Sequence, residues 1–166
     1  MIVLGDVFAV IATLLASFLT SYAMILGLSL LYPSRSRAAA NYLATNSAQG
    51  FWRGLLMGGG ALFGLVVLSQ VPVPLAKLAS LLGFCLLICV AMVGASGITQ
   101  NMANRLRTMD PGLSPHAALS KSTMLLVGAG LFPVVGWFLF APAILFVSLG
   151  GGIAAWRRDA ATVEAA

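Results

Sequence analysis

The sequence contains very little charge. Only 8% of its 166 residues are charged, whereas an ordinary soluble domain has roughly 25%. Acidic residues are the scarcest, with four Asp and Glu against nine Lys and Arg and a formal net charge of +5. Hydrophobic residues make up 60% of the chain, and the mean hydropathy is +1.02. Because a water-soluble fold with so few charges would precipitate, these values exclude soluble proteins and predict a protein of the lipid bilayer.

Residues that carry catalysis or bind metals are also rare. His116 is the only histidine, and the two cysteines, Cys85 and Cys89, lie four apart in an apolar run. The chain has no HExxH motif, no phosphate-binding loop and no histidine pair for haem. We therefore predict a non-enzymatic protein without cofactor, catalytic residues or metal site, in which both cysteines pack as small apolar side chains.

The basic residues mostly flank the apolar stretches. This distribution is typical of membrane proteins whose cationic side chains contact anionic lipid headgroups. Nucleic-acid binding would require a basic face with interleaved polar or aromatic side chains. The expected partner is therefore a bilayer with anionic headgroups, and no nucleic acid.

Four apolar stretches are candidate membrane spans, since about twenty helical residues cross the hydrocarbon layer. They cover residues 7–32, 51–70, 75–99 and 123–155. Asp6 precedes the first stretch as a helix cap, Pro33 ends it, and the Val-Pro-Val-Pro turn at 71–74 makes the second and third a hairpin. We predict an all-α, polytopic transmembrane bundle in which residues 1–166 form a single integral-membrane domain.

Small residues mark the faces on which the spans are expected to pack. Glycines spaced four apart let another helix backbone approach closely, as in a GxxxG contact. We expect this partner to lie within the chain, with a second copy as the alternative. The predicted helix-packing residues are Gly54, Gly58, Gly60, Gly64, Gly94 and Gly97.

Residues at the ends of the spans are expected to anchor the helices at the membrane surface. Trp52 and Arg53 stand at the start of the second span, and Lys77 at the start of the third can extend its amine to the headgroups. Arg157 and Arg158 follow the last apolar run. These five residues are the predicted interfacial anchors.

The last apolar run, Thr123 to Trp156, is 34 residues long and carries no charge. As one straight helix it would measure about 50 Å, although the hydrocarbon layer is only about 30 Å thick. Pro133 and Gly136 are the predicted break, because proline removes a backbone donor and glycine adds backbone freedom. We predict three full spans followed by a broken helical hairpin, re-entrant because its first arm is short; a fourth, Pro-kinked span is the alternative.

The positive-inside rule then orients the chain. Arg35 and Arg37 place the first connector in the cytoplasm, which puts the N-terminus outside. A terminal hairpin keeps the C-terminus inside. The predicted location is the cell membrane, crossed several times.

The order of these features resembles a known family. The chain has an opening span that ends Leu31-Tyr32-Pro33, a connector with Arg35 and Arg37, Gly-rich and Pro-linked spans, and the segment 131–137 before a Gly-rich C-terminal part. In this order it resembles the membrane domain found with bactofilins, which are bacterial polymer-forming cytoskeletal proteins. The resemblance covers most of the chain. It implies a bacterial inner-membrane protein that anchors or organises other components, and it supplies no catalytic residue.

Two functions are compatible with this sequence. The first is a structural, anchoring or assembly subunit that acts through helix packing, in homo-oligomers or in a larger membrane complex. The alternative is a small oligomeric channel or transporter in which the broken helix at 133–137 lines the path. Hydroxyl groups along the first span fit either function, as a polar lining or as donors to a neighbouring helix; they belong to Thr13, Ser17, Thr20 and Ser21.

Overall fold

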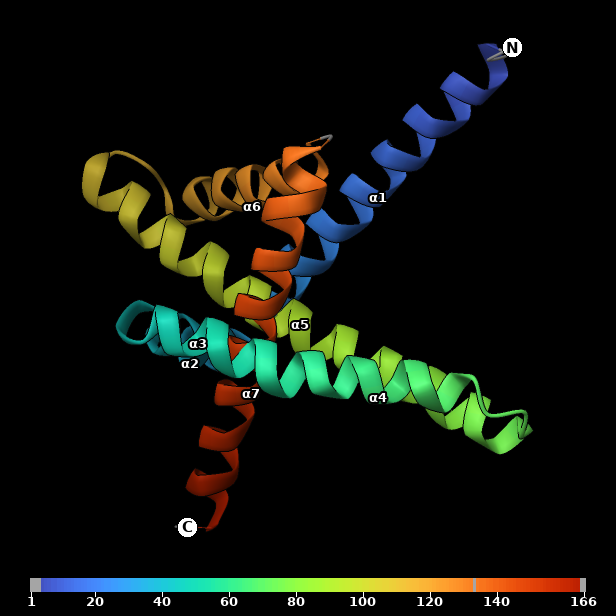
Figure 1. Cartoon of the computed structure of the whole chain (residues 1–166). Coiled ribbons are helices and arrows are strands. Elements are labelled where there is room, and N and C mark those ends of the chain that lie inside the picture. Colours follow the sequence, from blue (N-terminus) through green and yellow to red (C-terminus); the bar gives the residue numbers. More distant parts are fainter. Residues whose placement is uncertain (1–3, 133, 165–166) are drawn as a thin grey trace.

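The structure is a computed structural model that describes residues 4–132 and 134–164, and the side chains of residues 5–132 and 134–156. This part of the chain is helical and contains no strand (Figure 1). Its elements are α1 (Leu4–Leu31), α2 (Pro33–Thr45), α3 (Ser47–Arg53), the π-helical turn η1 (Gly54–Gly58), α4 (Gly59–Ser69), α5 (Pro74–Met109), α6 (Pro115–Leu131), the π-helical turn η2 (Gly136–Phe140) and α7 (Ala141–Glu164).

Four of the described helical segments are long and apolar enough to cross a membrane. They cover Gly5–Leu31, Ser47–Ser69, Pro74–Met109 and Gly136–Trp156. The predicted all-α, polytopic bundle is confirmed at this level. Helix α6 has 17 residues and is not among the four.

Helix α5 runs ten residues beyond the predicted third span, from Thr99 to Met109. The segment after Thr99 is polar but contains no helix breaker until the sequence Asp110-Pro111-Gly112. The whole helix has 36 residues and is therefore about 54 Å long. Its polar C-terminal end extends past an apolar part that is already long enough to cross the hydrocarbon layer.

The last apolar run is broken into two helices, and its second part, Gly136–Trp156, is by itself the fourth segment that is long enough to span. Helix α6 ends at Leu131 and η2 begins at Gly136. Val134 between them has a φ of 66°, which is a strained conformation for a β-branched residue. Gly136 has no positive φ; a Cβ there would lie 2.6 Å from the carbonyl oxygen of Ala129. Gly136 therefore permits close backbone contact at the break, and Pro133 lies outside the described residues.

Helix α5 is the centre of the bundle. It packs against α7, α2 and α6, and its first half forms the hairpin with α4. Figure 1 shows α7 crossing α5, while the first half of α1 projects away from the other helices. The crossing is close because Gly152 of α7 lies against the backbone of Val90 in α5, and Gly94 of α5 lies against that of Ser148 in α7.

Most of the buried side chains are small. They include several alanines and eight Ser or Thr residues, which let the helix axes approach closely. Their hydroxyls are mostly paired within their own helix: Ser96 donates to the carbonyl oxygen of Val93 at 2.7 Å and Ser122 to that of Ala118 at 2.8 Å. These bonds satisfy the hydroxyls without adding polar surface to the helix contacts.

Candidate functional site

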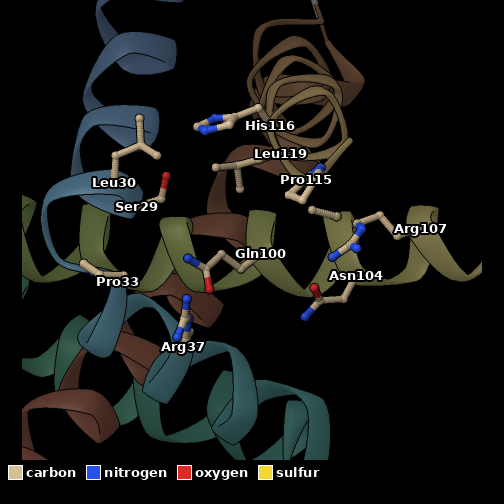
Figure 2. Close-up of a pocket in the computed structure, with 11 residues that line it drawn as sticks. Ser29, Leu30, Pro33, Arg37, Gln100, Asn104, Arg107, Pro115, His116 and Leu119 are labelled. Carbon is tan, nitrogen blue, oxygen red and sulfur yellow. The ribbon is translucent and has the colours of Figure 1, made fainter. Parts of the chain in front are cut away.

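A basic pocket of about 300 Å³ lies where four helices meet. The end of α1 and the first turns of α2 form one side, and the C-terminal part of α5 and the first turn of α6 form the other (Figure 2). The polar side chains that line it are Ser29, Arg37, Gln100, Asn104, Arg107 and His116. Residues from four separate stretches of the sequence therefore form one site.

Local sequence signals place these side chains. Pro33 is the first residue of α2, which puts Arg37 one turn into that helix. Gln100, Asn104 and Arg107 are spaced four and three apart on α5, so they share one face of the helix. The hydroxyl of Ser114 accepts a hydrogen bond from the amide of Ala117 at 3.3 Å and caps the start of α6.

The electrostatics of the pocket are positive. None of its lining residues is acidic, and the N-terminus of α6 adds the positive end of a helix dipole. Among the described residues, neither Arg37 nor Arg107 has a hydrogen bond or an ion pair. Figure 2 shows the guanidinium of Arg37 below the side-chain amide of Gln100, and that of Arg107 beside Asn104. An arrangement of this kind can bind an anion, because guanidinium and amide N–H groups are strong donors to oxyanions.

Other arginines are already engaged. Arg53 donates from Nη1 to the hydroxyl of Tyr42 at 3.1 Å, which ties α3 to α2. The guanidinium of Arg35 lies 5.0 Å from the ring centre of Trp156 and 5.7 Å from that of Tyr32, within range of a cation–π contact. These contacts hold α2 against its neighbours, and they leave Arg37 and Arg107 as the pocket's cations.

Four of the six predicted packing glycines lie at helix crossings. A Cβ on Gly54 would overlap the carbonyl oxygen of Phe146, and one on Gly94 would overlap that of Ser148. A Cβ on Gly97 would lie 2.6 Å from that of Ala39, and one on Gly58 would lie 2.6 Å from a methyl of Leu149 in α7. All four contacts are within the chain.

Gly60 and Gly64 are placed differently. A Cβ on either would meet no heavy atom within 4 Å, so they pack against no other helix of the described chain. The glycines that the sequence reasoning did not single out are Gly150 and Gly152, where a Cβ would overlap backbone atoms. Their signal in the sequence is the run of three glycines at 150–152.

The predicted anchors that the structure describes are on the surface. Trp52, Arg53 and Lys77 are exposed, and Trp52 shows 61% of its surface. Lys77 lies in the first turn of α5, beside the turn that joins it to α4. The side chains of Arg157 and Arg158 lie outside the described residues.

The Ser and Thr hydroxyls of α1 make no hydrogen bond to another helix within the described chain. Thr13 donates to the carbonyl oxygen of Ala9 in its own helix at 2.7 Å. The hydrogen bond that joins α1 to α6 comes from Tyr22, whose hydroxyl lies 2.7 Å from that of Ser120. The small and hydroxyl-bearing face of α1 is therefore open.

The residues with metal-binding or redox chemistry are dispersed. Among the described residues, no three His, Cys, Asp or Glu side chains gather as metal ligands. Cys85 and Cys89 are exposed and free on α5. His116 has no such neighbours and lies in the basic pocket.

Comparison of the chain with protein-family models, with curated proteins and with solved structures found no match. The resemblance to the membrane domain found with bactofilins stays a prediction.

Proposed function

We propose that the chain is a non-enzymatic structural or assembly subunit of the membrane, and that α1 is the helix that docks on a partner. The observation that carries this proposal is the isolation of the first half of α1. Every side chain from Gly5 to Thr13 is exposed, although this segment is apolar and helical. The rest of the chain packs into a bundle without it.

The composition of the open face supports a helix partner in addition to lipid. Ala12, Thr13, Ala16, Ser17 and Thr20 are all exposed and recur at helical spacing along one side of α1. Small and hydroxyl-bearing residues are typical of contacts between membrane helices, because they allow close approach and hydrogen bonds. The partner helix belongs to a second copy or to another membrane protein.

The remainder of the chain supplies a rigid base for this helix. Glycines at the α5–α7 and α3–α7 crossings bring backbones into direct contact, and the Tyr22–Ser120 hydrogen bond fixes the second half of α1 to α6. A rigid base limits the entropy that is lost when α1 binds. This favours a subunit that presents one helix to a partner.

The alternative of a channel through the broken helix has less support. Among the described residues around the break, Phe132, Val134, Val135 and Trp137 are apolar and exposed, and Gly136 is buried. Such side chains suit lipid contact and do not offer the polar groups that a solute path needs. We therefore keep the assembly function as the proposal.

The proposed location is the bacterial inner membrane, with the N-terminus outside and the C-terminus inside. Arg37 and Arg107, from the two basic connectors, line the same pocket, so these connectors lie on one side of the bundle. The positive-inside rule favours the cytoplasm for that side. Cysteines introduced at Pro72 and Gly112, both exposed, should then react with an impermeant thiol reagent from opposite sides of the membrane.

The docking proposal is tested by disulfide cross-linking in membranes. Cys85 and Cys89 are first replaced by alanine, and Ala16→Cys is compared with Leu15→Cys, which is exposed at the same depth on another side of α1. We expect a cross-linked dimer, or a cross-link to a co-purified protein bearing a cysteine, for Ala16→Cys only. Equal cross-linking at both positions, or none at either, would contradict a specific partner on the small-residue face.

A further inference from the structure

The basic pocket has the donors of a phosphate site. Arg37 and Arg107 supply guanidinium groups from α2 and α5, and His116 supplies ring nitrogens from the first turn of α6. Arginine binds phosphate with two parallel hydrogen bonds. At the start of α6, Pro115 has no N–H and the amides of Ala117 and Ala118 donate to Ser114, so side chains supply most of the donors. No carboxylate lines the pocket to neutralise these groups. The pocket is therefore complementary to an anion with several oxygens.

A second cavity lies along three of the same helices, α1, α5 and α6, with α7 in place of α2. It has a volume of about 230 Å³ and is lined mostly by apolar side chains of α1, α5, α6 and α7. On α1, Ile25 lines this cavity and Ser29, four residues later, lines the basic pocket. On α5, Ala95 lines this cavity and Gln100, five residues later, lines the basic pocket. These offsets of four and five residues correspond to about 6–8 Å along a helix. The basic pocket and the apolar cavity are therefore offset along the helices by a distance that suits the charged headgroup and the acyl chain of a lipid.

One buried polar group in the deeper cavity has no partner. Ser148 is among the residues that line this cavity, but it is only 2% exposed, and its hydroxyl oxygen is fully buried and makes no hydrogen bond. An unpaired buried hydroxyl costs free energy. Because this oxygen is covered by protein atoms, a ligand in the cavity would reach it only if the surrounding helices shifted.

We propose that these two cavities bind one anionic phospholipid, with its phosphate in the basic pocket that Arg37, Arg107 and His116 line and an acyl chain in the deeper cavity. The four helices around the ligand are α1, α2, α5 and α6, with α7 behind the chain. The lipid would then join helices that are far apart in the sequence. Its removal is expected to loosen the contact of α1 with the bundle.

The test measures thermal unfolding of the purified full-length protein in a neutral detergent. Dioleoylphosphatidylglycerol, dioleoylphosphatidylcholine and inorganic phosphate are each titrated in. Because a ligand that binds only the folded state stabilises it by mass action, we expect the melting temperature to rise with phosphatidylglycerol and to change far less with the other two. Equal stabilisation by phosphatidylcholine would overturn the charge recognition, and equal stabilisation by phosphate would overturn the lipid assignment.

The headgroup site is tested with the pair Arg37→Gln and Arg107→Gln. Both side chains are exposed and without partners among the described residues, so the melting temperature without lipid should not change. The double variant should need at least tenfold more phosphatidylglycerol for half of the shift. The control is Arg105→Gln with Lys121→Gln, two exposed cations that do not line the pocket. Equal loss in both double variants would show a non-specific charge effect and overturn the site.

The acyl-chain site is tested with Gly130→Leu. Gly130 lines the deeper cavity, and a Cβ there meets no heavy atom within 4 Å, so the new side chain enters free space. It should weaken stabilisation by dioleoylphosphatidylglycerol but not by dihexanoylphosphatidylglycerol, whose chains are short. Gly128→Leu is the matched control, because Gly128 is equally open and lies outside this cavity. Unchanged lipid affinity in Gly130→Leu would place the chain elsewhere and refute this part of the proposal.

Discussion

Replacement of Gly94 by alanine tests the central crossing of the bundle. The new Cβ would overlap the carbonyl oxygen and lie too close to the carbonyl carbon and Cα of Ser148. These are backbone atoms of a helix, so they cannot rotate away as a side chain would. Helices α5 and α7 would have to separate. Other close contacts, including that of Gly152 with Val90, would then be lost together.

The expected loss of stability in Gly94→Ala follows from the loss of close packing between α5 and α7. A gap of about 1 Å removes up to half of the dispersion energy of the atoms that it separates. Overpacking of a tight contact costs about 1–3 kcal/mol. Because the backbone of Ser148 cannot move aside, we expect a cost at the upper end of this range. Alanine recovers up to about 1 kcal/mol of helix propensity. We expect a net loss of about 2 kcal/mol, or a fall of about 4–8 °C in the melting temperature of a chain of this size.

Gly60→Ala is the control for this experiment, because Gly60 also lies in a predicted membrane helix but faces open space. The same change of residue there should leave the melting temperature unchanged or raise it slightly. Thermal unfolding of both variants is followed by circular dichroism in the same detergent. If Gly94→Ala unfolds within about 1 °C of the parent chain, the close crossing of α5 and α7 is not present, and the reasoning from glycine contacts fails.

Three further predictions use the same measurement. Gly150→Ala should destabilise the chain about as much as Gly94→Ala, because its Cβ would overlap the carbonyl oxygen of Gly50; a neutral result would argue against contact between α3 and α7. Tyr22→Phe should cost about 1 kcal/mol through loss of the bond to Ser120, and adding Ser120→Ala should cost little more, whereas full additivity would show that the two hydroxyls do not interact. Val134→Gly should raise the melting temperature by removing a strained positive φ, and a lower value would contradict that strain.

Much of the helical architecture could be predicted because its causes are local. Pro33 and the prolines of the 71–74 turn end and begin helices at the expected places, and the segment 110–112 stops α5. Helix α5 continues to Met109, ten residues past the predicted third span, because polar residues alone do not end a helix. Polar residues such as Gln100 have ordinary helix propensity, so a helix can leave the hydrocarbon layer and continue into water.

The candidate site was beyond prediction for the opposite reason. Arg37, Arg107 and His116 each looked like a residue of a polar connector, and nothing in the spacing of distant residues shows that they line one cavity. His116 in particular had no metal-binding neighbour in the sequence. Its role depends on where α6 starts relative to α5, which is set by packing.

The sequence by itself determined that the chain is helical and apolar enough for the bilayer, because hydropathy and helix breakers act over a few residues. Tertiary structure alone decided which glycines meet another backbone: Gly94 lies at a crossing while Gly60 faces open space, although both sit in apolar helices. It also decided which arginines share a pocket. Contacts between helices depend on the three-dimensional path of the whole chain, and that path is set by the packing of surfaces that are far apart in the sequence.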